Sequence, residues 1–170
     1  GDVAAPFKFT HTANALGRMA MINALFWGRN RMSRLVVPWC TYTDPEIAHV
    51  GLYEAQAKER GIPVTTLPVP MEENDRALLD GVSEGFVRIH LKQGTDRVLG
   101  ATIVAAHAGD LLTYFTLCMT ASQGLAALAG PIYPYPTQAE VIKRIAQRQL
   151  QTTLSPGVKR LLAWVLASRR

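Results

Sequence analysis

The stretch that decides the fold reads Gly85-Phe86-Val87-Arg88-Ile89-His90-Leu91-Lys92. Apolar and polar side chains alternate along it, as they do on a β-strand with one buried face. The next four residues, Gln93-Gly94-Thr95-Asp96, are typical of a turn, and residues 97–105 follow as a second, largely apolar run. This pattern predicts a β-hairpin.

The segments on both sides extend the hairpin into an α+β domain. Apolar, β-rich runs predict strands at 35–43, 47–52 and 64–69, with a short helix at 53–60 and an acidic turn with some helix at 71–79. Helical spacing predicts helices at 107–123, 125–129 and 137–150, the last with a capping-box pattern at Thr137 and Glu140. Three prolines exclude a helix or central strand at 131–136. The order of elements predicts an antiparallel sheet with helices packed on one face.

Composition limits the possible classes of protein. The 170 residues are 48% hydrophobic and 18% charged, enough for one compact domain. No apolar run approaches the roughly 20 residues that span a bilayer, and two distant cysteines, Cys40 and Cys118, suit a reducing cytoplasm. Residues 141–170 carry seven Lys and Arg and no acid within a net charge of +5. No interleaving of aromatic and basic residues accompanies them, so we expect a solvated helical tail and no nucleic-acid partner.

Six stretches, in order, carry a resemblance to a known family. They are Gly1-Asp2, residues 41–51, Asp75-Arg76-Ala77, Gly85-Phe86-Val87, Leu99-Gly100-Ala101, and residues 135–140 with the sequence Tyr-Pro-Thr-Gln-Ala-Glu. Together they resemble the pyridine nucleotide-disulfide oxidoreductases, most closely the mercuric-reductase-like members. The resemblance implies an FAD-dependent NAD(P)H:disulfide oxidoreductase that works as a homodimer on a small-molecule substrate, either a disulfide or a metal ion.

The resemblance also divides the chain into three parts. Residues 1–34, with a helix at 10–27, resemble the terminal segment of the FAD-binding domain, and residues 35–150 resemble the dimerisation domain. Tyr114, Phe115 and Met119 of the long helix are candidates for the dimer interface. Residues 151–170 would form a C-terminal helical extension with a helix at 157–168. Packing of that helix on the partner subunit is favoured over contact with a membrane surface.

The resemblance assigns FAD contacts to the first segment. In the family, the Asp of the Gly-Asp pair accepts hydrogen bonds from the ribityl hydroxyls, a role that falls on Asp2. Phe9, Thr10 and His11 would offer the helix N-terminus to the flavin, since backbone amides there stabilise negative charge. The residues alone favour a disordered terminus for Asp2 and a helix-cap or surface position for His11.

Tyr135 and Glu140 are the predicted catalytic residues. The family's usual form is His-Pro-Thr-x-x-Glu, in which the Glu orients a His that acts on the substrate of the opposite subunit. Here Tyr135 replaces the His, and a phenol titrates near pH 10 rather than about 6.5. We therefore expect Tyr135 to position a substrate or donate to it, with Glu140 as its acceptor. The alternative is that Glu140 only caps its helix. Tyr133, two residues earlier, is expected at the interface.

Several features of the family do not occur in this sequence. It has no Cys-x₄-Cys redox pair, no Gly-rich dinucleotide fingerprint, and no Cys-Cys pair within residues 151–170. Cys40 and Cys118 are expected to be buried and inert, and the histidines have no metal-ligand spacing, so we predict no metal site. Because the chain opens at Gly1 inside a cofactor motif, we expect an inactive fragment of the enzyme. The alternative is a stand-alone, non-catalytic dimerisation module.

Overall fold

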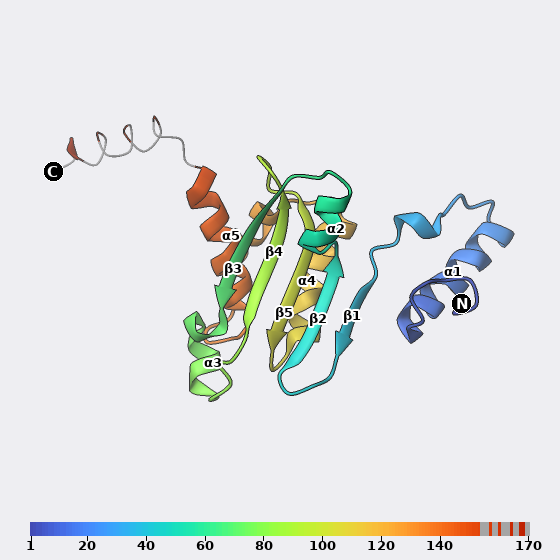
Figure 1. Cartoon of the computed structure of the whole chain (residues 1–170), viewed down its shortest axis with the longest axis horizontal. Helices are drawn as coiled ribbons and strands as arrows, with labels where there is room; N and C mark the ends of the chain where they lie inside the picture. The colour runs from blue at the N-terminus through green and yellow to red at the C-terminus, as the bar shows by residue number, and fades with distance from the viewer. Residues whose placement is uncertain (154–156, 158–159, 161–163, 165–166, 169–170) are drawn as a thin grey trace.

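A five-stranded antiparallel sheet forms the centre of the protein (Figure 1). The computed structural model describes residues 1–153, 157, 160, 164, 167 and 168. The strands lie in the order β1-β2-β5-β4-β3. Their bounds are Pro38–Thr41 for β1, Glu46–Gly51 for β2, Val64–Pro70 for β3, Phe86–Lys92 for β4 and Val98–Ala105 for β5. The predicted α+β class is confirmed.

The predicted hairpin forms between β4 and β5 and lies inside the sheet. Val87, Ile89 and Leu91 are buried on one face of β4, while Arg88 between them is exposed, as the alternation predicts. Ile89 pairs with Ala101 of β5. The turn at 93–96 closes with the Thr95 amide donating to the Lys92 carbonyl over 3.0 Å.

Two helices cover the face of the sheet that carries these apolar side chains. Helix α4 (Ala108–Thr120) packs on β5, β2 and β1, and α5 (Glu140–Thr153) packs on β3. Phe115 of α4 is fully buried between helix and sheet. It therefore belongs to the core of its own chain, and its predicted place at the interface is wrong. The short elements are η1 (Met32–Arg34), α2 (Glu54–Glu59), η2 (Met71–Glu73), α3 (Asp75–Leu79) and η3 (Leu125–Leu128).

Helix α1 (Thr10–Leu25) stands apart from the helix-covered sheet, beside the β1 edge (Figure 1). A contact of 2.8 Å joins Nε2 of His11 to the Pro38 carbonyl oxygen at the start of β1. Large apolar side chains stay exposed at the end of α1, among them Met21, Leu25 and Trp27. No helix among the described residues is long and apolar enough to cross a bilayer.

The start of α5 corrects one prediction. The helix begins at Glu140 rather than at Thr137, and the Thr137 hydroxyl donates to the Pro134 carbonyl over 2.8 Å instead of capping the helix. The Glu140 amide donates to the Thr137 carbonyl over 3.3 Å, so a tight turn replaces the capping box. The helix predicted at 157–168 falls largely outside the described residues.

Two buried histidines lie within the sheet. His49 on β2 stacks on Tyr53 with ring centroids 3.6 Å apart, and its Nδ1 lies 2.9 Å from the Thr102 hydroxyl. His90 on β4 has its Nδ1 2.9 Å from the Thr66 hydroxyl. Burial is the main cause that lowers the pKa of both histidines. The backbone contact with Gly51 opposes this shift at His49, and the charge of Glu54 opposes it at His90.

These histidines predict a loss of stability in mild acid. Below about pH 6.5 the unfolded chain takes up protons that the folded histidines resist, so the free energy of unfolding falls as the pH falls. Urea unfolding at pH values between about 5 and 7 should show this slope. His49→Gln should flatten it, whereas the control His107→Gln, at an exposed position, should not. If His49→Gln leaves the slope unchanged, buried His49 is not a source of the loss of stability in acid.

Candidate active site

The proline-rich turn between η3 and α5 carries the predicted catalytic tyrosine. Tyr133 on this turn donates its hydroxyl to the Leu128 carbonyl over 3.1 Å, and its ring lies 5.9 Å from that of Tyr114. Burial, followed by the nearby Tyr114 and Cys118, raises the pKa of Tyr133 to about 12. Tyr133 therefore anchors the turn to the core of its own chain.

Tyr135 is 70% exposed and has a partner that the sequence did not predict. Its hydroxyl donates to Oδ2 of Asp75 over 3.1 Å, and the Tyr135–Pro136 peptide is cis. The hydrogen bond to Asp75 and the charge of that carboxylate raise the pKa of Tyr135, with a smaller contribution from the charge of Glu140. Tyr135 is thus held as a neutral phenol with its hydrogen directed at Asp75.

Glu140 does not orient Tyr135, contrary to prediction. It is half-buried in the first turn of α5, and its carboxylate makes no hydrogen bond or ion pair with any residue in the described part of the chain. Asp75, rather than Glu140, accepts from the phenol.

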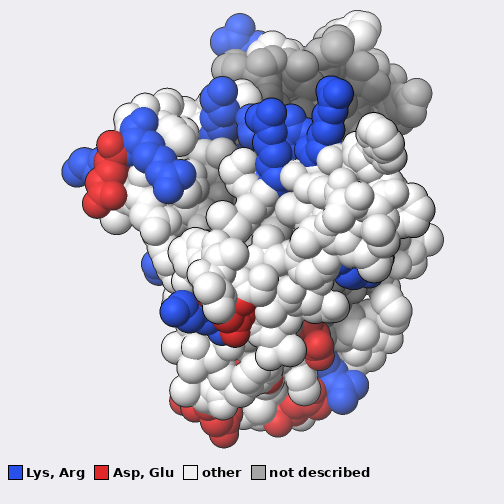
Figure 2. All heavy atoms as spheres, turned by 90° about the vertical axis from the view of Figure 1, so that its right-hand side faces the viewer, with Lys and Arg blue, Asp and Glu red and all other residues white. Residues whose placement is uncertain are grey.

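Two carboxylates act on Tyr135. They belong to Asp75, at the start of α3, and to Glu140, at the start of α5, and α3 lies at the lower end of the sheet in Figure 1. A site with two carboxylates disfavours anions and attracts neutral or cationic groups. The opposite side of the molecule, where α1 and β1 lie, carries most of its acidic side chains at the lower end and several basic ones towards the upper end (Figure 2).

The residues predicted to contact FAD lie around the N-terminus of α1. Phe9 is the N-cap residue and no side chain caps the helix, so the amides of the first turn are available to an electron-rich group. The rings of Phe9 and His11 stack with centroids 5.3 Å apart. Asp2 is exposed nearby in sequence but makes no hydrogen bond or ion pair with another described residue. An uncapped helix start of this kind fits the flavin edge, which gains negative charge on reduction.

The two groups of predicted site residues lie at opposite edges of the sheet. His11 contacts Pro38 at the β1 edge, whereas Tyr135 contacts Asp75, which follows β3 at the other edge (Figure 1). The fold therefore does not bring the FAD-contact residues and Tyr135 together within one chain.

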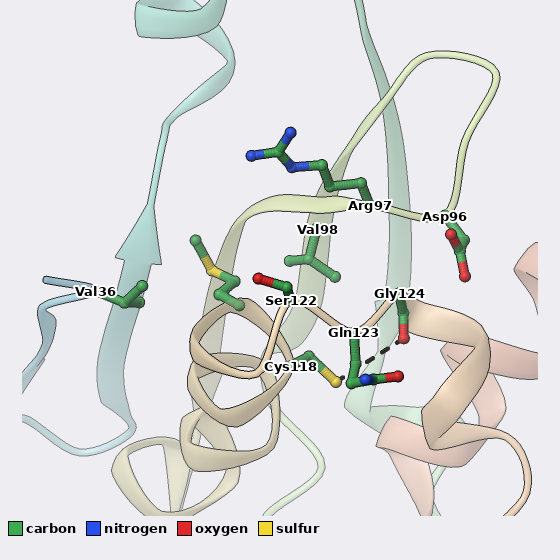
Figure 3. A pocket seen from close by; sticks show the side chains of 9 residues that line it. Val36, Asp96, Arg97, Val98, Cys118, Ser122, Gln123 and Gly124 are labelled. Atoms are coloured by element: carbon green, nitrogen blue, oxygen red, sulfur yellow. Dashed lines mark hydrogen bonds between the residues drawn. The ribbon is translucent and has the colours of Figure 1, made fainter. Parts of the chain in front are cut away.

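The cysteines lie away from Tyr135, next to two cavities. A cavity of about 480 Å³ at the C-terminal end of α4 is lined by Cys118, Val98 and Ser122 among others (Figure 3). Burial raises the pKa of the Cys118 thiol. Cys40 lines a second cavity of about 320 Å³ with His11 and Glu46. Cys40 is only half-buried rather than buried as predicted, and burial and then Glu46 raise its pKa. Within the described residues no group of three His, Cys, Asp or Glu side chains could hold a metal ion.

Comparisons with known proteins identify the family. Residues 37–146 match the family model of the pyridine nucleotide-disulphide oxidoreductase dimerisation domain. The chain is 37% identical to a mercuric reductase of Streptomyces lividans over 147 aligned residues. The alignment covers 86% of this chain and 31% of the relative. The chain is 32% identical over 151 residues to a dihydrolipoyl dehydrogenase of Mycoplasma pneumoniae, covering 88% and 33%. The chain thus spans about a third of the length of the curated relatives it matches.

Solved structures agree with the fold. The flavoprotein disulfide reductase RclA of Escherichia coli superimposes with a TM-score of 0.79 at 22% identity, covering 86% of this chain and 34% of that one. LpdA of Mycobacterium tuberculosis gives a TM-score of 0.77 at 27% identity, covering 88% and 32%. From the family match and these relatives, the chain belongs to the pyridine nucleotide-disulphide oxidoreductase family and carries its dimerisation domain.

Proposed function

We propose that this chain is the dimerisation part of a homodimeric, FAD-dependent NAD(P)H:disulfide oxidoreductase of the cytoplasm, and that it completes the active site of its partner subunit. The observation that carries the proposal is the separation of the α1 N-terminus and Tyr135 by the width of the sheet. A site that needs both groups must then take them from two chains. In a two-fold symmetric dimer this arrangement would produce two identical sites.

In this proposal each group of residues has a separate task. The first turn of α1, with Phe9, Thr10 and His11, binds the flavin edge through backbone amides, and Asp2 accepts from the ribityl hydroxyls. FAD, when bound, supplies the transfer of electrons from NAD(P)H towards a redox disulfide. Tyr135 contacts the substrate in the partner's site.

The acidic surroundings support the choice of substrate class. Asp75 and Glu140 favour a neutral or cationic small molecule, such as a disulfide without net negative charge or a metal ion. Glu140 would contribute as a half-buried negative charge beside the substrate rather than through Tyr135. The chain on its own is inactive in this proposal, because it has neither the Cys-x₄-Cys redox pair nor the Gly-rich dinucleotide fingerprint.

The test uses the full-length protein that contains this chain. We expect the purified protein to carry bound flavin, to oxidise NAD(P)H in the presence of a disulfide or a metal ion, and to sediment as a dimer. The 170-residue chain should show no such turnover. A full-length protein that dimerises without flavin and without NAD(P)H oxidation would contradict the proposal and favour a non-catalytic dimerisation module.

A further inference from the structure

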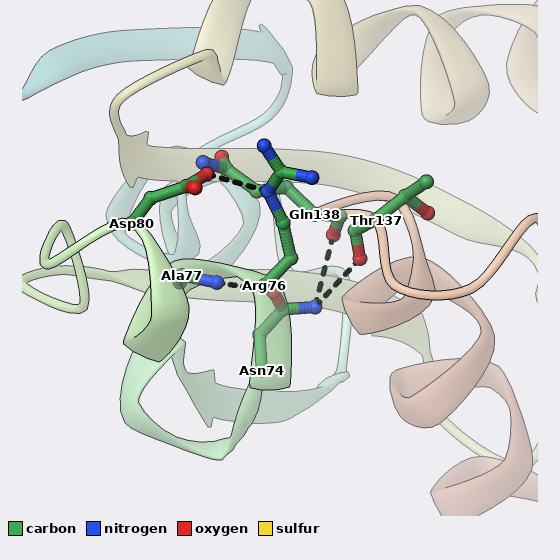
Figure 4. A network of polar contacts seen from close by, with 6 residues as sticks. All are labelled: Asn74, Arg76, Ala77, Asp80, Thr137 and Gln138. Carbon is green, nitrogen blue, oxygen red and sulfur yellow. Dashed lines mark hydrogen bonds and ion pairs between the residues drawn. The ribbon is translucent and has the colours of Figure 1, made fainter.

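Three consecutive residues at the junction of η2 and α3 each contact the segment that begins at Tyr135. The carboxylate of Glu73 pairs with Arg148 and, over 3.5 Å, with Arg144, both on α5. Nδ2 of Asn74 donates to the carbonyls of Thr137 and Gln138, over 3.1 and 3.3 Å (Figure 4). Asp75 accepts from Tyr135. We call residues 73–75 the clamp.

Asn74 is the best fixed member of the clamp. It is 2% exposed, and its Oδ1 accepts from the Ala77 amide over 2.9 Å, which caps α3. Because Oδ1 is engaged by a donor, Nδ2 must face the two carbonyls of the turn, as Figure 4 shows. Behind the clamp, the Met71 amide donates to the Gly85 carbonyl over 3.1 Å and ties it to the start of β4.

Asp75 has a different task from its neighbours. Its carboxylate can only accept hydrogen bonds when ionised, so the hydrogen between it and Tyr135 belongs to the phenol. The phenol has one hydrogen and two lone pairs. With the hydrogen directed at Asp75, the lone pairs are what Tyr135 can offer to a second group.

We propose that the clamp of Glu73, Asn74 and Asp75 positions Tyr135, and that Asp75 makes Tyr135 an acceptor rather than a donor towards the substrate. Asp75 and its neighbours are positioning residues, because they act through Tyr135. The role towards the substrate rests on the proposed function, whereas the clamp itself rests on the contacts above. Of the two roles expected from sequence, this proposal keeps the positioning of a substrate by Tyr135 and replaces donation to it.

The first test measures the contact in the chain itself. Subtracting the ultraviolet titration of Tyr135→Phe from that of the unchanged chain isolates the ionisation of Tyr135. Asp75→Ala should move its midpoint to lower pH, towards the ordinary value near 10. Asn74→Ser, which keeps an oxygen that can cap α3 but has no amide donor to the turn and adds no charge, should move it in the same direction. Glu140→Gln should have a smaller effect, because Glu140 contributes least to the pKa of Tyr135.

Asp80→Ala is the matched control. Asp80 lies at the end of α3 and pairs with Arg76 over 2.7 Å rather than with the turn. It should leave the Tyr135 midpoint unchanged. If Asp75→Ala also leaves the midpoint unchanged, the clamp is refuted, whatever the activity of the enzyme.

The second test uses the full-length flavoenzyme. Asp75→Ala and Tyr135→Phe should each lower kcat/KM by roughly three- to tenfold, and the double variant should lose no more than the larger single loss, because both remove one interaction. Asp75→Asn, which retains an acceptor oxygen, should restore most of the activity. If the fold-losses in kcat/KM of the two single variants multiply in the double variant, Asp75 and Tyr135 act independently, and the positioning role of Asp75 is overturned. A shifted midpoint with unchanged kinetics would support the contact and refute the proposed role of Tyr135 in the active site.

Discussion

Gly85→Ala is expected to lower the free energy of unfolding by about 4 kcal/mol or to prevent folding altogether. Gly85 has φ +116°, a conformation that L side chains rarely adopt, and a Cβ at this position would overlap the carbonyl oxygen of Val104 on β5. The overlap is with backbone in the middle of the sheet, so no side-chain rotation relieves it. Since the Gly85 carbonyl also binds Met71, the change would displace the clamp that holds Tyr135.

Urea unfolding with a matched glycine checks this prediction. Gly94, in the turn of the same hairpin, has φ +75° but open space around its Cβ position. Gly94→Ala should therefore cost only the backbone strain, about 1–2 kcal/mol. Equal losses at Gly85 and Gly94 would mean that the contact with Val104 is absent and that the start of β4 lies elsewhere.

Phe115→Ala is expected to lower the free energy of unfolding by about 3–5 kcal/mol. The side chain is fully buried between α4 and the sheet, and its removal leaves a cavity that the closely packed core cannot refill without strain. This change tests the assignment of Phe115 to the core of its own chain rather than to a dimer interface.

Leu117, two positions along the same helix, is the control for Phe115. It is 63% exposed, so Leu117→Ala should change the free energy of unfolding by no more than about 0.5 kcal/mol. Both variants should be measured by urea unfolding over a range of protein concentrations. If the loss of unfolding free energy in Phe115→Ala depends on protein concentration, Phe115 contributes to a dimer interface, which would contradict its assignment to the core.

The fold could be predicted closely because its signals are local. Alternation at 85–92, the turn at 93–96 and the glycine at 124 each depend on neighbouring residues, and the structure has the hairpin and α4 close to where these signals lie. The capping box failed for a physical reason. Thr137 had a second possible partner, the Pro134 carbonyl, and its hydroxyl bonds there instead.

The site was harder to predict because its contacts are distant in sequence. Tyr135 and Asp75 are 60 positions apart, and Asn74 contacts carbonyls 63 and 64 positions away. Periodicity and turn chemistry carry no information about such pairs. The one available signal was the Asp75-Arg76-Ala77 stretch, which contributed to the family resemblance without a role of its own. The structure shows that Asp75, in this stretch, accepts the hydrogen bond from Tyr135.

The most direct test of the central proposal, that Tyr135 serves the partner subunit, is kinetics on a defined heterodimer of the full-length enzyme. One subunit carries Tyr135→Phe and intact redox cysteines, and the other lacks a redox cysteine but keeps Tyr135. Only one site in this heterodimer is competent, and it should receive its tyrosine from the cysteine-deficient subunit. We predict the unchanged kcat/KM per competent site, and the reduced value when Tyr135→Phe is moved to the cysteine-deficient subunit. The opposite assignment of the two values would show that Tyr135 acts within its own subunit and would contradict the proposal.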